Sequence, residues 1–371
     1  MVSLFTKNVI FRMEWRKVKQ KVTIQDIADA LGVSRNTVSK AINNTDGLAE
    51  ATRVKILQKA VEMGYKQFSY VQALTRGDGS PVAAPPQNTE IREVALLTSM
   101  YFSGSHFAST MLDRLQRELM QLGYRLNTYH VRQEDISART LPFSFDPGQV
   151  SAVVCVEMFD WDYDMMLCEL GLPILFIDGP IRKGGRSLPA DQLYMDASEI
   201  RRLVSGMLEK GVRRIGFVGD HEHCESFYER YLGVCCSLLM AGIPVEDRFI
   251  IPAISPADIL CRLRALEELP ELFVCANDFV AYDTLHALRA LGKSVPEDVM
   301  LAGFDDAPES RILVPQLTTV HIHTQIIAYS AAQLLISRIN EPSLDFRKVY
   351  TETELICRES TKYLPFGESN T

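Results

Sequence analysis

The chain has 371 residues, of which 47% are hydrophobic and 23% charged, and its net charge is −8. This length allows two or three domains with large cores, and the acidic total alone argues against a nucleic-acid-binding protein. The charge is unevenly spread, however. Residues 1–76 hold 13 Lys and Arg against 6 Asp and Glu, a charge of +7, whereas residues 77–371 carry −15. Only the N-terminal part is therefore expected to meet a polyanion.

The cysteines and the apolar runs predict a cytoplasmic protein. None of the eight cysteines forms a C-x-x-C pair, so we expect reduced, buried thiols. No apolar run approaches the ~18 residues that a membrane span needs. Residues 1–21 are interpreted as an N-terminal extension without a secretory signal, in which Met13 is a second candidate initiator.

Residues 22–68 are predicted to form a small all-α domain with a helix-turn-helix. In the stretch TIQDIADALGVSRNTVSKAIN, Thr23 can cap a first helix, Gly32 can end it, and Ser34 can cap a second helix. The apolar period of ATRVKILQKAVEMGY indicates a third helix. The side chains expected to face the core are Ile24, Ile27, Ala28, Leu31, Val33, Val38, Ile42, Val54, Leu57, Ala60 and Val61.

The outward face of the second predicted helix carries side chains that suit DNA. These are Arg35, Asn36, Ser39, Lys40 and Asn43. Arg and Lys can pair with guanine and Asn with adenine, while Ser and Asn can bind phosphate. The alternative is a helical bundle with a solvated polar face, which the local excess of positive charge disfavours.

The motifs VSRNTVSKAIN, ATRVKIL and EMGY resemble the DNA-binding head of the LacI/GalR family of bacterial transcription regulators. The resemblance implies that Arg35 and Asn36 read bases and that Lys40 also reaches the groove. It further implies contacts to the DNA backbone from Ser34, Thr37 and Asn43.

A hinge helix follows the head in this family, and residues 69–76, SYVQALTR, occupy its place. The resemblance gives Leu74 the role of a wedge in the minor groove of the operator centre. The sequence departs from the family here, because Gln67 and Phe68 replace the usual Pro-Asn and Val71 replaces an Ala. Residues 77–90 are rich in Gly, Pro and Ser and are interpreted as a linker that is longer than usual.

Residues 91–362 alternate short apolar runs with amphipathic helical patterns, which predicts parallel sheets covered on both faces. Because about 270 residues exceed one comfortable open sheet, we expect two doubly wound α/β lobes that bind effector and dimerise, followed by a tail at 363–371. The motifs FYERYLGV, CANDFVA, MLAGFDDA and VPQLTTV resemble the family's effector domain, which is itself similar to periplasmic sugar-binding proteins. The resemblance implies three crossings between the lobes, with Asp196 at one and LTTV beginning the third.

Open parallel sheets bind ligands at the carboxyl ends of their strands, so the residues that follow each strand are the candidates. Aromatic rings that can stack on a sugar and polar groups that can bracket its hydroxyls gather there. The candidates are Tyr101, Phe107, Phe159, Trp161, Asp178, His223, Asn277, Asp278 and Asp305. Family resemblance implies that Arg230 and Asp278 hold the effector.

Two other classes of protein were weighed. An enzyme would need a nucleophile elbow, a phosphate loop or paired catalytic carboxylates, and the sequence has no such motif. An exported sugar-binding protein would lack the head. No cofactor, metal or catalytic residue is expected, and the His-x-His pairs at 221–223 and 321–323 do not match a zinc motif. The sequence predicts a homodimeric repressor that binds a pseudo-palindromic operator and is controlled by a sugar-like effector.

Overall fold

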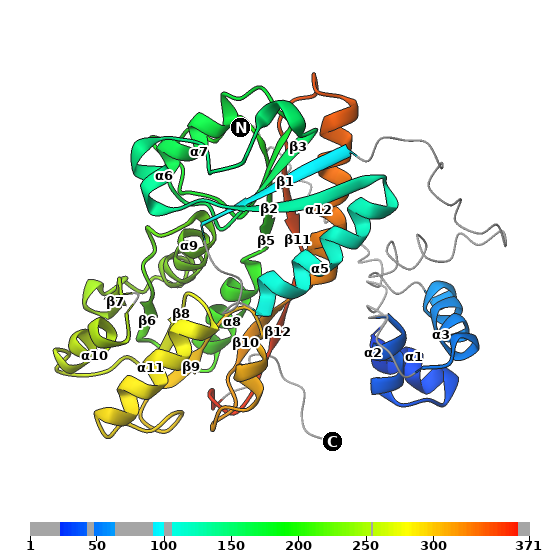
Figure 1. The fold of residues 1–371 in the computed structure, drawn as a ribbon. Coiled ribbons are helices and arrows are strands. Elements are labelled where there is room, and N and C mark those ends of the chain that lie inside the picture. The colour runs from blue at the N-terminus through cyan, green and yellow to red at the C-terminus, as the bar shows by residue number, and fades with distance from the viewer. Residues whose placement is uncertain (1–22, 43–47, 64–91, 100–105, 254, 363–371) are drawn as a thin grey trace, which may run out of the picture. The chain divides into compact units, whose positions relative to one another are not determined.

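The computed structural model describes residues 23–42, 48–63, 92–99, 106–253 and 255–362. The chain divides into two compact units, residues 1–84 and residues 85–371, and each is treated by itself (Figure 1). The expected N-terminal extension, hinge helix, linker and tail lie outside the described residues, as do Asn43, Leu74 and Tyr101.

The first unit contains α1 (Ile24–Leu31), α2 (Arg35–Ile42) and α3 (Glu50–Met63). Thr23 caps α1 in a capping box with Asp26, and Gly32 ends the helix at a φ of 64°, a conformation that glycine adopts without strain. The core comprises Ile27, Ala28, Val38, Ala41, Ile56 and Ala60. Ile24, Leu31 and Val33 are only partly buried, and the side chains of Ile42, Val54, Leu57 and Val61 are not described. The helix-turn-helix prediction is confirmed.

The first lobe of the second unit is a six-stranded sheet in the order β11-β5-β4-β3-β1-β2, and all its neighbouring strands are parallel. Its strands are β1 (Arg92–Thr98), β2 (Tyr124–His130), β3 (Ala152–Val156), β4 (Ile174–Ile177), β5 (Asp191–Met195) and β11 (Lys348–Thr351). The helices of this lobe are α5 (His106–Gln121), α6 (Gln133–Ala138), α7 (Trp161–Cys168) and α12 (Thr324–Asn340), with a short 3-10 turn at η3 (Pro147–Gln149).

The second lobe is a four-stranded parallel sheet in the order β7-β6-β8-β9. Its strands are β6 (Ile215–Val218), β7 (Ile250–Ile251), β8 (Leu272–Cys275) and β9 (Met300–Ala302). The helices that follow the first lobe in the chain are α8 (Ser198–Glu209), α9 (Glu225–Met240), α10 (Pro256–Arg264) and α11 (Asp278–Ala290), with 3-10 turns η4 (Asp247–Phe249) and η5 (Pro308–Arg311). The two-lobed fold class is confirmed.

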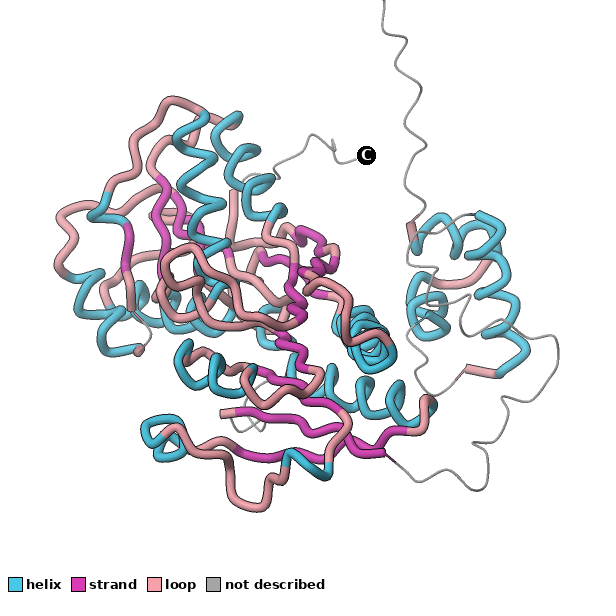
Figure 2. The backbone as a smooth tube through the Cα atoms, turned by 90° about the horizontal axis from the view of Figure 1, so that it is seen from above, coloured by secondary structure: helices cyan, strands magenta, loops and turns pink. Residues whose placement is uncertain are grey.

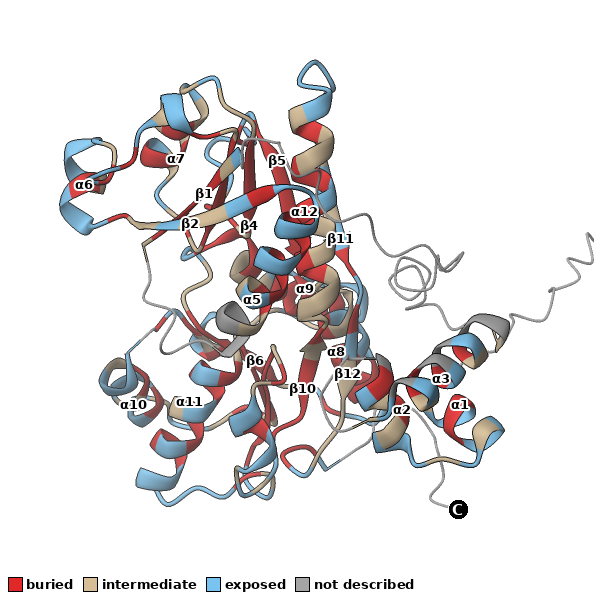
Figure 3. Ribbon diagram, turned by 45° about the vertical axis from the view of Figure 1, so that its right-hand side comes forward, coloured by how far each residue is buried: buried red, intermediate tan, exposed pale blue. Residues whose placement is uncertain are grey.

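The inner strands β3, β4, β5, β6 and β8 are buried on both faces, as Figure 3 shows. Strand β1 is buried from Val94 onward, whereas the edge strands β2 and β11 are partly exposed. Alternate residues of β1 enter different cores: Val94 and Leu96 pack with α5, whereas Ala95 and Leu97 pack with α7. This division follows from the two-residue period of a strand. It explains why these strands appear in the sequence as continuous apolar runs rather than alternating ones.

A two-stranded antiparallel ribbon of β10 (Thr319–Ile322) and β12 (Thr353–Ile356) joins the lobes. β10 leads from the β9 side to α12, and β12 leads from β11 back toward Leu301, whose N–H donates to Ser360 O. The expectation that LTTV begins the third crossing is therefore wrong: this segment forms the second crossing in chain order, and β12 forms the third. The smooth trace of Figure 2 shows the strands of the body, in magenta, flanked by its helices, in cyan.

Ion pairs hold α12 and β11, the last elements that the chain adds to the first lobe, against β5. Asp191 at the start of β5 is fully buried and accepts from Arg338 of α12 and Arg347 beside β11, at 3.0 and 3.1 Å. A buried carboxylate needs such partners, so this cluster specifies where α12 and β11 join the sheet.

All eight cysteines are free thiols, but Cys236 and Cys261 are exposed, so the expectation of uniformly buried thiols is wrong. Both lie on the outward faces of α9 and α10. No helix among the described residues combines the length and the apolar character that crossing a bilayer requires.

Candidate functional site

The outward face of α2 presents the predicted DNA-reading side chains. Arg35, Asn36 and Lys40 are exposed, and Ser39 is half-buried. Ser34 caps the helix by accepting from Thr37 N–H at 3.1 Å, and its hydroxyl lies 2.7 Å from the Thr37 hydroxyl. These two hydroxyls therefore fix the start of α2, so that the first turn projects Arg35 and Asn36 away from the core.

A second candidate site lies where the carboxyl ends of the two parallel sheets face each other. Phe159, which follows β3, meets His223, which follows β6, with ring centroids 4.8 Å apart. Arg182 of the first lobe donates to Glu225 at the start of α9 at 2.6 Å. Glu225 N–H also donates to Gly179 O at 3.0 Å. We call this region the interlobe cleft.

Arg230 of α9 is the central cation of the interlobe cleft. Its side chain is 3% exposed, and its guanidinium carbon lies 3.6 Å from the centroid of the Phe304 ring. One Nη donates to Ala276 O at 2.6 Å, and the other lies 3.7 Å from Asp305 Oδ1. Arg230 thus ties α9 to the carboxyl ends of β8 and β9 while its remaining donors face the cleft carboxylates.

The cleft holds Asp178 and Asp305, both predicted from the sequence. It also holds a third acidic residue, Glu157, which sequence reasoning missed. Val156 pairs with Ile177, so Glu157 and Asp178 follow neighbouring strands in register. All three acidic residues have positive φ, at 55°, 59° and 117°. Such conformations are uncommon outside glycine and cluster at functional sites. Glu157 was missed because the expected strand included it, whereas β3 ends one residue earlier, at Val156.

Burial shifts the acidity of these carboxyls. It raises the pKa of Glu157 to about 7, and the neighbouring Asp178 and Asp305 carboxylates add to the rise. Burial likewise raises the pKa of Asp305 to about 6, against the lowering effect of Arg230. The pKa of Asp178 is also raised by burial, although the Gly179 N–H and Arg230 oppose this. The cleft therefore holds more negative charge than Arg230 neutralises.

Asp278 and Asn277, both predicted to bind the ligand, make hydrogen bonds within the protein. Asp278 Oδ1 accepts from the Thr319 hydroxyl at 2.6 Å and Oδ2 accepts from Ala307 N–H at 2.8 Å. A side chain at Gly303 would collide with Asp278, so glycine is needed there. Asn277 caps α11 by accepting from Val280 N–H at 2.9 Å.

Of the remaining aromatic candidates, Trp161 opens α7 and packs on the apolar cluster beneath that helix. Phe107 belongs to α5, but its side chain is not described. The structure thus brings together Phe159, His223, Asp178, Arg230 and Asp305, and it directs Trp161 toward the core of the first lobe.

Asp306 connects the cleft to the β10 crossing. It pairs with Arg311 and Arg358, each at 2.5 Å, and with His321 of β10 at 3.0 Å. Burial alone would raise the pKa of Asp306, but hydrogen bonds from His321, Arg311 and Arg358 outweigh it and lower the pKa. Asp306 is therefore a structural anion at the crossing, next to the cleft residue Asp305.

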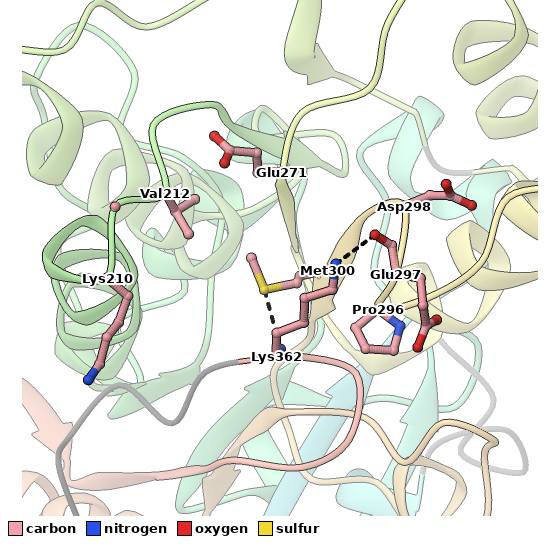
Figure 4. A pocket seen from close by; sticks show the side chains of 9 residues that line it. Lys210, Val212, Glu271, Pro296, Glu297, Asp298, Met300 and Lys362 are labelled. Atoms are coloured by element: carbon pink, nitrogen blue, oxygen red, sulfur yellow. Dashed lines mark hydrogen bonds between the residues drawn. The ribbon is translucent and has the colours of Figure 1, made fainter.

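A separate cavity of about 200 Å³ lies at the opposite edge of the second lobe (Figure 4). Its lining residues precede the strands: Val212 lies before β6, Glu271 before β8 and Asp298 before β9. Lys362 closes one side by donating to Glu297 O at 2.6 Å. This position at the amino ends of the strands is the wrong edge for a ligand of an open parallel sheet.

Two family models match the chain. Residues 23–67 match the model described as bacterial regulatory proteins, lacI family, and residues 204–361 match a periplasmic binding protein-like domain. Among curated relatives, "Probable HTH-type transcriptional repressor ExuR" of Bacillus subtilis is 26% identical over 349 residues, covering 92% of this chain and 99% of its own. The transcriptional repressor PurR of Mannheimia succiniciproducens is 24% identical, with 92% and 98% covered.

Solved structures share the fold. The complex of the transcriptional regulator CelR with cellobiose aligns with a TM-score of 0.64 at 24% identity, covering 91% of this chain and 99% of that one. The lac repressor dimer bound to operator and the anti-inducer ONPF aligns with a TM-score of 0.61 at 19% identity, covering 92% and 99%.

Replacement of Glu157 by Gln tests the crowding of charge in the cleft. The pKa of Glu157 is about 7 in the folded state against an ordinary 4.5, so the folded state holds a proton that the unfolded chain has lost between these values. Stability contributed by this group therefore falls as the pH rises from about 4.5 to 7. Glu157→Gln should raise the free energy of unfolding by about 1–3 kcal/mol at pH 8 and far less at pH 5, measured by urea denaturation. Exposed Glu267→Gln is the control, and an equal effect at both pH values would contradict the assignment.

Replacement of Asp278 tests whether it is a structural bridge. Asp278→Ala leaves the Thr319 O–H and the Ala307 N–H without their acceptor, so we expect the free energy of unfolding, measured by urea denaturation, to fall by about 2–4 kcal/mol. Asp278→Asn keeps one acceptor for Ala307, and its amide can donate to Thr319, so the loss should be smaller. Equal stability of wild type and Asp278→Ala would show that the bridge contributes nothing.

Proposed function

We propose that the chain, which matches the lacI family model over residues 23–67 and a periplasmic binding protein-like domain over residues 204–361, is a regulator of that family that represses transcription by binding an operator under the control of a small effector. The observation that carries the proposal is the pairing of an exposed DNA-reading face on α2 with a charged cleft between two lobes. The relatives are transcription regulators and not enzymes.

In this proposal residues 22–68 bind DNA, residues 69–76 form the hinge and residues 77–90 link them to the body. Arg35 and Asn36 read base edges in the major groove, and Lys40 reaches the same groove. Ser34, Thr37, Ser39 and Asn43 contact the DNA backbone, and Leu74 enters the minor groove at the operator centre. A repressor that acts on chromosomal operators works in the cytoplasm, where we place the protein.

We propose that residues 91–362 bind the effector and form a homodimer. One head covers part of a groove, and two heads related by a two-fold axis read a pseudo-palindromic operator. Cellobiose in the related CelR complex supports a sugar or sugar derivative as the class of effector. The effector is bracketed by Phe159 and His223 and held by Asp178, Arg230 and Asp305.

Effector binding changes operator affinity only if the ligand prefers one lobe arrangement. The cleft provides such a preference, because its groups come from both lobes: Asp178 and Phe159 from the first, Arg230 and His223 from the second. A ligand bridging these groups stabilises the arrangement that brings them together.

The DNA-reading role of Arg35 is tested on an operator selected from a randomised DNA pool. Arg35→Ala should weaken operator binding by about 1–3 kcal/mol and relax the base preference at one position in each half-site, because a bidentate contact is lost. Fluorescence anisotropy with the selected operator and with random DNA measures this. A uniform loss on both DNAs would make Arg35 a phosphate contact instead.

The effector site is tested by a thermal-shift screen against sugars, sugar derivatives and nucleosides, followed by anisotropy of labelled operator with each hit. Arg230→Lys keeps the buried charge but loses the planar fork that can hold two oxygens. We expect Arg230→Lys to bind the operator as the wild type does when no effector is present. Its free energy of effector binding should be weaker by about 2–5 kcal/mol, so the effector should no longer change operator affinity at the same concentration. If no screened compound changes operator affinity in the wild type, effector control by these classes fails.

A further inference from the structure

We infer that the effector carries a positive charge on a hydroxylated ring, as an amino sugar does, and that the cleft rejects sugar acids and sugar phosphates. This inference rests on the proposed function, because it takes the interlobe cleft as the effector site. It assigns Glu157 the role of selecting the charge of the effector.

The arrangement of the backbone places the carboxylates together. Glu157 and Asp178 follow the paired residues Val156 and Ile177, and neighbouring strands lie about 4.8 Å apart. Asp305 approaches from the second lobe, where its N–H donates to Val320 O at 2.8 Å and its carboxylate lies 3.7 Å from Arg230. Three acidic groups from three strand ends therefore face one region of the cleft.

Among the described residues, Arg230 does not balance the negative charge of these three carboxylates. Arg230 is shared, since one of its Nη atoms is already bound to Ala276 O. It acts on Asp178 and Asp305, whereas the charged neighbours of Glu157 are these two carboxylates. Like charges that are partly shielded from water repel strongly, so these carboxylates favour a bound proton or another cation.

Two further acidic residues, Asp160 and Asp220, follow β3 and β6, whose carboxyl ends meet at the cleft. Asp160 accepts from Tyr163 N–H at 2.8 Å and caps α7, and Asp220 accepts from Glu222 N–H at 3.0 Å. Both carboxylates are held at the ends of strands that open on the cleft. An ammonium group on the ligand would neutralise charge that the protein leaves uncompensated, while its hydroxyls donate to the same carboxylates. A ligand carboxylate or phosphate would instead add to the repulsion.

The experiment uses the full-length protein and three series of sugars, based on glucose, galactose and mannose. Each series contains the neutral parent sugar and its 2-amino, N-acetylamino and uronic acid derivatives. Glucose 6-phosphate is added as the phosphate. Titration calorimetry and thermal shift at pH 7 measure binding. We expect the 2-amino member of at least one series to bind 10-fold or more tightly than its neutral parent and its N-acetyl form. The uronates and the phosphate should not bind.

Glu157→Gln links this preference to the named residue. It should lower the affinity for the bound amino sugar about 10-fold and change the affinity for the neutral parent less than 3-fold. Glu267→Gln, an exposed control, should change neither. Urea denaturation of Glu157→Gln shows that the variant is folded.

The outcomes separate the two levels of the proposal. A neutral sugar, uronate or phosphate that binds at least as tightly as the amino sugar and alters operator binding overturns the charge inference and leaves the effector site standing. Absence of binding by every amino sugar, or an unchanged preference in Glu157→Gln, also overturns the inference. Failure of every compound in the wider screen to alter operator affinity overturns the proposed function itself.

Discussion

The geometry of the body depends on a guanidinium that is held almost entirely out of water. Arg230 is 3% exposed, and it lies on the Phe304 ring, donates to Ala276 O and faces Asp305. A buried cation is tolerated only when hydrogen bonds and opposite charges replace its hydration. The strand ends around it are arranged to supply them, which brings α9 and the carboxyl ends of β8 and β9 into one place. The lobe that carries Arg230 is thereby organised around its charge, and the first lobe contributes further acids across the cleft.

The cleft is mechanically connected to the ribbon that joins the lobes. Asp278 and Asp306 both bond β10: the first accepts from the Thr319 hydroxyl, and the second pairs with His321. Asp305, the residue before Asp306, faces Arg230. A ligand that moves Asp305 therefore acts on a backbone that is already bonded to Val320 of the crossing strand. Differential binding in the cleft can in this way bias how the lobes meet, which is the physical requirement for control by an effector.

The sequence predicts well what depends on local pattern. Thr23, Gly32 and Ser34 act as capping residues, the strand ends led to Asp178 and Asp305, and the family resemblance led to Arg230. It predicts poorly what depends on register and on contacts between distant segments. Glu157 was missed because one residue decides whether a strand has ended. The two oxygens of Asp278 are taken up by Thr319 and Ala307, which lie 41 and 29 positions away, and no local pattern reports such contacts.

The N-terminal part of the chain is basic and the remainder is acidic, and this separation affects both DNA and effector binding. The basic excess of residues 1–76 attracts a DNA backbone, while the −15 of the remainder repels it, so non-specific binding is confined to the head. An acidic body gives an anionic effector an unfavourable approach and a cationic one a favourable approach, even before contact. The local excess at Glu157, Asp178 and Asp305 acts in the same direction as this long-range field. In our proposal the same sign of charge therefore serves two discriminations, against DNA on the surface of the body and against acidic ligands within its cleft.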